Sequence, residues 1–142
     1  MAVLASILVA ACMSATPPPA AHVVAKRLVF TTSLAKFVAT ADSNKRDSRL
    51  TWTTDGCSVP VLGSTGRTYD FYNACRRHDF AYRNIGKLDN GKWWTAEMRA
   101  KVDDVFKKDM LSDCKQRPKT SRASCNAWAE TYYRAVRVYA GP

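Results

Sequence analysis

The fold of this chain is decided by the stretch Tyr69-Asp70-Phe71-Tyr72-Asn73-Ala74-Cys75-Arg76-Arg77-His78-Asp79-Phe80-Ala81-Tyr82-Arg83-Asn84. It contains no glycine or proline, and its less polar side chains recur at steps of three and four. This spacing predicts an amphipathic helix from about Tyr69 to Ile85. The inner stripe consists of Phe71, Cys75, His78, Tyr82 and Ile85. We expect the intervening polar residues on the opposite face: Asn73, Arg76, Arg77, Arg83 and Asn84.

The inner stripe of this helix carries His78 at its middle, and Asp79 follows about 100° further round. A buried imidazole needs a hydrogen-bond partner, and a carboxylate at the rim can hold a cation. A single histidine on an apolar stripe is more often a satisfied core residue than a catalytic one. The cysteine one turn earlier, and a second cysteine beside Asp55-Gly56, favour a functional site.

The chain has 142 residues and a net charge of +10. This length allows one domain that buries roughly two-thirds of its unfolded surface. The positive charge favours anionic partners, namely nucleic acid, anionic lipid or acidic polysaccharide, and charge alone does not choose among them.

The N-terminus begins with the apolar run MAVLASILVAACM, followed by small residues and three prolines. The run is too short for a transmembrane helix and is typical of a secretory signal peptide, which we expect over residues 1–21. An apolar membrane-associated N-terminus is the alternative. Residues 22–27 are a possible pro-segment, because they end in the dibasic pair Lys26-Arg27. Residues 28–142 would then form the domain of a secreted, extracellular protein.

Removal of the signal peptide would take Cys12 with it and leave four cysteines: Cys57, Cys75, Cys114 and Cys125. An even number in a small secreted domain predicts two disulfides, with three possible pairings. We favour Cys57–Cys75 and Cys114–Cys125, because each closes a short loop. A zinc site built from all four is the alternative, but no Cys-x2-Cys spacing is present.

The remaining patterns also predict helices. One is expected over residues 28–41, a loop leads up to Thr68, and a turn follows at 87–92. Another helix begins near Thr95, and Asp103 borders its apolar face. Cys114 to Cys125 would enclose a basic loop, after which a last helix presents a stripe of Cys125, Trp128, Ala129, Tyr132, Val136 and Tyr139. We therefore expect an all-α bundle of about four or five helices with two disulfides.

The Asp55-Gly56 loop, tied by the expected disulfide to the helix of Asp79, offers two carboxylates and backbone carbonyls. These hard oxygen ligands suit Ca²⁺, with waters or a substrate phosphate completing its shell. A calcium ion beside His78 suggests hydrolysis, in which the imidazole takes a proton from water. A serine nucleophile is poorly supported, because no Gly-x-Ser-x-Gly motif is present.

Three blocks of sequence together resemble the small secreted phospholipase A2 family of bacteria and filamentous fungi: residues 53–57, 75–84 and 102–106. The resemblance covers roughly residues 30 to 140. It implies an all-α fold and calcium-dependent hydrolysis of the sn-2 ester of glycerophospholipids, releasing a lysophospholipid and a free fatty acid.

By this resemblance, His78 matches the general base and Asp103 the carboxylate that orients it. Asp79 and Asp55 match the calcium carboxylates, and the backbone carbonyl of Gly56 is a further ligand. Gly56 departs from members that have a bulkier residue there, and Trp93-Trp94 has no counterpart. The two tryptophans are candidates for contact with a lipid interface, and packing of at least one of them into the core is the simpler alternative.

The expected substrate is a phospholipid membrane surface or micelle, with anionic lipid favoured. We expect no nucleic-acid partner and a monomeric enzyme. The alternative is a non-enzymatic basic secreted module that binds anionic membrane or polysaccharide. The complete set of His78, Asp79, Asp55 and Asp103 argues against that alternative.

Overall fold

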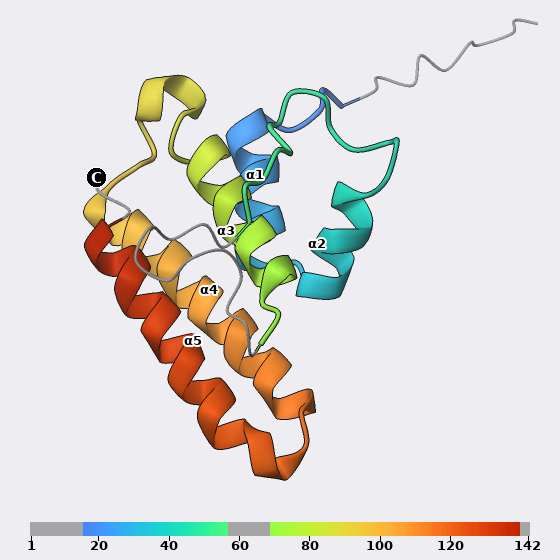
Figure 1. Cartoon of the computed structure of the whole chain (residues 1–142). Coiled ribbons are helices and arrows are strands. Elements are labelled where there is room, and N and C mark those ends of the chain that lie inside the picture. The colour runs from blue at the N-terminus through green and yellow to red at the C-terminus, as the bar shows by residue number, and fades with distance from the viewer. Residues whose placement is uncertain (1–15, 57–68, 140–142) are drawn as a thin grey trace, which may run out of the picture.

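A computed structural model describes residues 16–56 and 69–139 of the chain. It contains five α-helices and one short 3₁₀ helix in these ranges (Figure 1): α1 Ala21–Phe30, α2 Leu34–Ala41, α3 Tyr72–Asn84, η1 Leu88–Gly91, α4 Ala96–Gln116 and α5 Lys119–Tyr139. No strand occurs among the described residues. The expected all-α bundle of four or five helices is confirmed.

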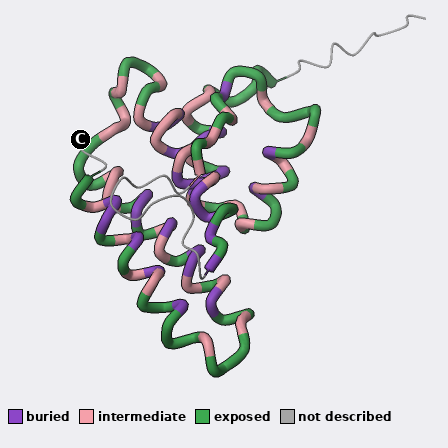
Figure 2. Tube along the Cα trace, in the orientation of Figure 1, coloured by how far each residue is buried: buried purple, intermediate pink, exposed green. Residues whose placement is uncertain are grey.

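The two longest helices, α4 and α5, form an antiparallel hairpin (Figure 1). Each has 21 residues and is therefore about 31 Å long. Helix α3 packs along α4, α2 packs on α3, and α1 contacts both α3 and α4. Two apolar clusters join these layers, and their buried members are among the purple segments of Figure 2. One lies between α3, α4 and α5, and the other unites α1 and α2 with α3 and the start of α4.

The single helix predicted over residues 28–41 is wrong, because two helices occupy this region. Helix α1 begins earlier, at Ala21, and ends at Phe30. The hydroxyls of Thr31 and Thr32 donate to the carbonyl of Arg27 at 2.9 and 3.0 Å, so side chains satisfy a carbonyl at the end of α1. Ser33 then caps α2 by accepting from the backbone N–H of Lys36.

The residues of the possible pro-segment, 22–27, lie within α1. Val24 and Ala25 are buried in the second apolar cluster. Cleavage after Arg27 would split this helix and detach both side chains from the core. The processing itself stays a prediction, and residues 1–15 of the expected signal peptide lie outside the described residues. Among the described helices, none is both long and apolar enough to cross a membrane.

The basic loop predicted between Cys114 and Cys125 is largely helical, because α4 continues to Gln116 and α5 begins at Lys119. Arg117 is extended, as expected of a residue before proline, and this ends α4. Cys114 and Cys125 form a disulfide with a Cα–Cα distance of 5.6 Å, which confirms this pair.

The other expected disulfide involves Cys57, which lies outside the described residues. Cys75 is buried and disulfide-bonded. Its pairing with Cys57 stays a prediction. At the other end of the chain, Tyr139 is 59% exposed rather than part of the buried stripe, because the last turn of α5 lies at the open end of the hairpin (Figure 1).

Candidate active site

The centre of the site is a hydrogen bond between His78 in α3 and Asp103 in α4. The Nε2 atom of His78 lies 2.8 Å from Oδ1 of Asp103. Both residues are buried, and the imidazole packs against the rings of Tyr82 and Phe106. An ionised carboxylate only accepts hydrogen bonds, so Nε2 carries the proton and Nδ1 has a lone pair. The structure thus brings together the two residues that the resemblance pairs as base and orienting carboxylate.

Asp103 has further partners that the sequence analysis did not identify. The Tyr82 hydroxyl donates to Oδ1 and Arg137 Nη1 donates to Oδ2, each at 2.8 Å. Burial alone would raise the pKa of Asp103, but hydrogen bonds from His78, Arg137 and Tyr82 hold it below its usual range. Burial raises the pKa of Tyr82 to about 12, so its hydroxyl keeps its proton and donates. Asp103 is therefore a fully buried, ionised acceptor.

Asp79 lies on the next position of α3 and meets the loop that carries Asp55. The Thr54 hydroxyl and the backbone N–H of Asp55 both donate to Asp79 Oδ2, the latter at 3.1 Å. Burial, together with the neighbouring Asp55 carboxyl, raises the pKa of Asp79 to about 6, although the Thr54 hydrogen bond opposes this. The structure therefore places the two expected calcium carboxylates side by side.

Gly56 follows Asp55 in this loop and has a left-handed conformation. Its φ is +71°, and its N–H donates to the Thr54 hydroxyl at 3.0 Å. Among residues 16–56 and 69–139, a Cβ atom here would meet the Tyr72 ring at 3.8 Å, which is an ordinary contact. The backbone angle rather than lack of space thus favours glycine at this position.

The donor chemistry of Asp55 and Asp79 fits a hard divalent cation. Within the two described ranges, no three His, Cys, Asp or Glu side chains cluster as a metal site. Backbone carbonyls and water are the further oxygen ligands that such a cation would take beside the two carboxylates. Burial beside a second carboxylate disfavours charge on Asp79, and a bound cation would relieve this penalty. Arg83 lies 3.5 Å from Asp55 and partly balances the exposed carboxylate.

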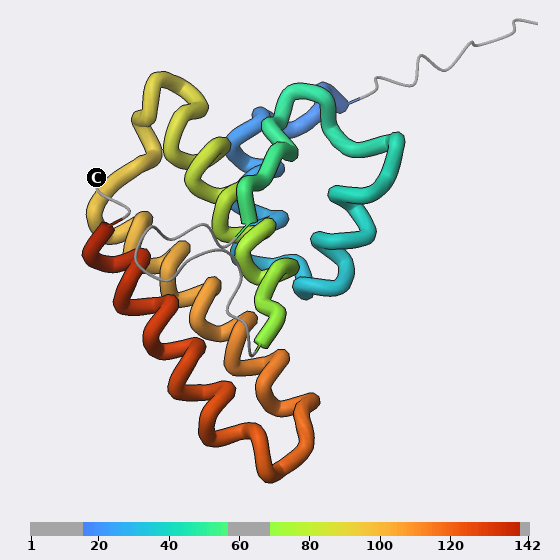
Figure 3. Tube along the Cα trace, in the orientation of Figure 1, coloured from blue at the N-terminus to red at the C-terminus, as the bar shows by residue number. Residues whose placement is uncertain are grey.

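Asn84 fastens the Asp55 loop to α3. Its Oδ1 accepts from the Thr51 N–H at 2.8 Å, and its Nδ2 donates to the carbonyls of Thr51 and Phe80 at 2.8 Å each. Figure 3 shows the chain before Gly56 running beside α3. The expectation that Asn84 lies on the polar outer face is wrong. Its side chain is fully buried because this pairing satisfies its amide.

Arg77 is likewise buried instead of lying on the outer face. Its Nε donates to Asp109 Oδ2 at 2.8 Å, and a second bond joins Nη2 to Oδ1. Its Nη1 donates to the carbonyl of Thr32 at 2.6 Å. One guanidinium therefore ties α3 to α4 and to the turn between α1 and α2.

Both tryptophans pack against the protein. Trp94 meets the Tyr82 ring edge-on at 4.6 Å between centroids. Trp93 stacks on His22 at 4.5 Å and donates to Asp89 at 2.6 Å. Both are partly buried against the second apolar cluster, which favours the packing interpretation over a lipid contact.

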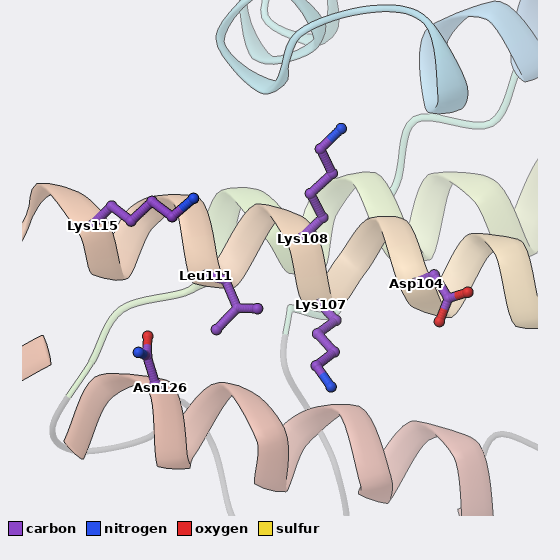
Figure 4. Close-up of a pocket in the computed structure, with 6 residues that line it drawn as sticks. All are labelled: Asp104, Lys107, Lys108, Leu111, Lys115 and Asn126. Atoms are coloured by element: carbon purple, nitrogen blue, oxygen red, sulfur yellow. The ribbon is translucent and has the colours of Figure 1, made fainter. Parts of the chain in front are cut away.

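A separate cavity of about 430 Å³ lies along α4 and α5, and its lining residues are Asp104, Lys107, Lys108, Leu111, Lys115 and Asn126 (Figure 4). Figure 4 shows Lys107 and Leu111 pointing toward α5, whereas Lys108 points away from it. Lys107 is paired with Glu130 at 2.6 Å. None of the candidate site residues lines this cavity.

Comparison with known proteins identifies the family of the chain. The family model of prokaryotic phospholipase A2 matches residues 25–140. A protein of Arthroderma benhamiae named secretory phospholipase A2 is 35% identical over 140 residues, covering 96% of this chain and 90% of the relative. A Beauveria bassiana protein of the same name is 33% identical over 115 residues, covering 81% of this chain and 56% of the relative. The chain therefore belongs to the prokaryotic phospholipase A2 family and is an enzyme of that family.

Proposed function

We propose that this enzyme is a secreted, calcium-dependent phospholipase A2. It hydrolyses the sn-2 ester of glycerophospholipids to a lysophospholipid and a free fatty acid. The observation that carries the proposal is the His78–Asp103 hydrogen bond beside the paired carboxylates of Asp79 and Asp55. Membership of the family and the names of the two relatives support the same activity.

The chemistry of the chain begins at Nδ1 of His78. Because Nε2 is bonded to Asp103, Nδ1 accepts a proton from a water molecule as that water attacks the ester carbonyl. Asp103 stabilises the resulting imidazolium through its negative charge. The same proton then passes to the departing alkoxide of the lysophospholipid, which returns the imidazole to its neutral form. No acyl-enzyme is formed.

Asp79, Asp55 and the backbone carbonyl of Gly56 would hold Ca²⁺. When bound, the ion supplies positive charge that stabilises the ester oxyanion and binds the substrate phosphate. Because the protein supplies few of the ligands, we expect the calcium affinity to be modest. Thr54 and Asn84 contribute by holding the loop against α3, so that Asp55 stays next to Asp79.

The charge of the chain supports a preference for anionic lipid. A net charge of +10 favours anionic membranes or micelles, at about 1 kcal/mol for each Lys or Arg near the surface. We propose a monomer that acts outside the cell, in line with the word secretory in the names of both relatives. Positive charge also suits the second candidate, a non-enzymatic module that binds anionic membrane or polysaccharide.

Fatty-acid release from mixed phosphatidylcholine and phosphatidylglycerol vesicles tests the proposal. We expect release with added Ca²⁺, none in excess chelator, and release slower by about two to four orders of magnitude from a His78→Asn variant that still binds the vesicles. Vesicle binding by the wild type without any release would favour the non-enzymatic candidate. Full release in chelator would contradict the calcium requirement alone.

A further inference from the structure

We propose that Arg137, in the last turn of α5, is a positioning residue that sets the orientation of Asp103 and, through it, of His78. This inference rests on the proposed hydrolysis. Arg137 acts through Asp103 and is not itself placed at the reacting atoms.

The two oxygens of Asp103 are held from different helices. Oδ1 accepts hydrogen bonds from His78 and Tyr82, both in α3, whereas Oδ2 accepts one from Arg137 Nη1 in α5. Rotation of a carboxylate about its last bond is broad unless both oxygens are held. Asp103 has no exposed surface, so bulk water does not replace a lost partner. The Arg137 hydrogen bond therefore fixes the plane in which Asp103 presents Oδ1 to the imidazole.

The helix end that carries Arg137 is itself attached to the same part of α4. Arg99 Nη2 donates to the carbonyls of Val136 and Arg137 at 3.0 and 2.9 Å. Arg99 Nε also donates to the Tyr82 hydroxyl at 3.3 Å. Arg99 thus holds the last turn of α5, while Arg137 reaches back to Asp103 one turn further along α4. These reciprocal links keep the guanidinium of Arg137 in place.

The charged and titratable groups around Asp103 come from three helices. They are His78 and Tyr82 in α3, Arg99 in α4 and Arg137 in α5. Arg99 Nε is 3.9 Å from Oδ2, beyond a hydrogen bond, so it does not substitute for Arg137. Removing the Arg137 guanidinium leaves the Asp103–His78 pair present but less well oriented. Such a change lowers the rate of the chemical step rather than substrate binding.

The test compares Arg137→Met, Arg137→Lys and the matched control Arg134→Met. Arg134 lies on α5 one turn earlier, is largely exposed and pairs with Glu130. A soluble short-chain phosphatidylcholine is the substrate, so that lost charge does not act through vesicle binding. We expect kcat to fall about tenfold in Arg137→Met with KM nearly unchanged. Arg137→Lys, which keeps a cation, should recover part of the rate, and Arg134→Met should match the wild type.

Proton NMR of the His78 ring N–H gives a readout that does not need activity. The resonance, assigned by its loss in His78→Asn, should broaden or shift in Arg137→Met and stay in place in Arg134→Met. Circular dichroism sets an assay temperature at which each variant is folded. If Arg137→Met does not fold, the rate and resonance of Arg137→Lys decide. A wild-type kcat in the Arg137 variant, an unmoved resonance, or an equal loss in Arg134→Met overturns the inference. A wild type that releases no fatty acid contradicts the proposed function instead.

Discussion

Arg77 and Asp109 form a doubly hydrogen-bonded ion pair that is buried between α3 and α4. Arg77 directly precedes His78 in the chain, and its third hydrogen bond reaches the turn after α1. The pair therefore joins both layers of the bundle next to the candidate active site.

We expect Arg77→Met to destabilise the fold by about 3–5 kcal/mol, because it leaves the Asp109 charge buried without its partner. Urea unfolding monitored by circular dichroism measures the loss. Arg76→Met on the same helix is the control, since Arg76 pairs with the exposed Asp42 and should cost much less. If both variants lost the same free energy of unfolding, the buried Arg77–Asp109 pair would stabilise the fold no more than an exposed pair does.

Removing the base should stop turnover without unfolding the protein. His78→Asn is expected to lower the hydrolysis rate by about two to four orders of magnitude while calcium binding persists. Initial rates on vesicles and titration calorimetry with Ca²⁺ measure these two properties. Near wild-type hydrolysis by this variant would exclude His78 as the general base.

The calcium requirement should depend on both paired carboxylates. We expect Asp79→Asn and Asp55→Asn to raise the Ca²⁺ concentration for half-maximal activity by about 10- to 100-fold. The effect of Asp79 should be larger, because it is less exposed and receives both loop hydrogen bonds. Asp113→Asn, which removes a carboxylate paired with Arg117 far along α4, serves as the control. Variants indistinguishable from this control would remove the calcium site from Asp79 and Asp55.

The buried amide of Asn84 should matter for both the fold and the loop. Asn84→Ala leaves the backbone groups of Thr51 without their partners, which costs about 1–3 kcal/mol. The freed loop should also require more Ca²⁺ for activity. Asn73→Ala, at an exposed position of the same helix, is the matched control for both measurements. An unchanged calcium requirement in Asn84→Ala would confine its role to the fold.

The charge of Asp103 should make stability depend on pH. Its hydrogen bonds hold the folded pKa below the unfolded value of about 3.9. The charged form is therefore stabilised by folding, and this contribution is present above the unfolded pKa and lost as the pH falls through the folded pKa. The stability advantage of the wild type over Asp103→Asn should shrink from about pH 5 to about pH 2. Urea unfolding across this pH range measures the difference in unfolding free energy between the two proteins. A wild-type advantage that grows on acidification would contradict a lowered pKa of Asp103.

The sequence was informative where a pattern repeats or a pair of groups is adjacent in the chain. The helical spacing around His78 located α3, and Asp103 was placed at the border of an apolar face that the structure puts against the imidazole. The even number of cysteines predicts two disulfides, and the short loop that it closes favours the Cys114–Cys125 pair, which the structure contains.

Periodicity was misleading for Arg77 and Asn84, because it sorts residues by polarity and assumes that polar side chains face water. Each is buried because a partner distant in sequence satisfies it, Asp109 for Arg77 and the Thr51 backbone for Asn84. The role of Arg137 and Tyr82 as partners of Asp103 is not predicted by the sequence for a related reason. Their role depends on the crossing of α3, α4 and α5 at Asp103, which no local spacing encodes.

The disulfide at the closed end of the α4–α5 hairpin gives this pair of helices a mechanical asymmetry. Cys114 and Cys125 join one end covalently, and Asp103 lies 11 residues, or about 16 Å of helix, away toward the other end. There Arg99 of α4 donates to a backbone carbonyl of α5, and Arg137 of α5 donates to the buried carboxylate of Asp103, which salt screens little. Reduction of the Cys114–Cys125 disulfide would therefore remove the covalent link at one end of the hairpin and leave the hydrogen bonds of Arg99 and Arg137 at the other end intact.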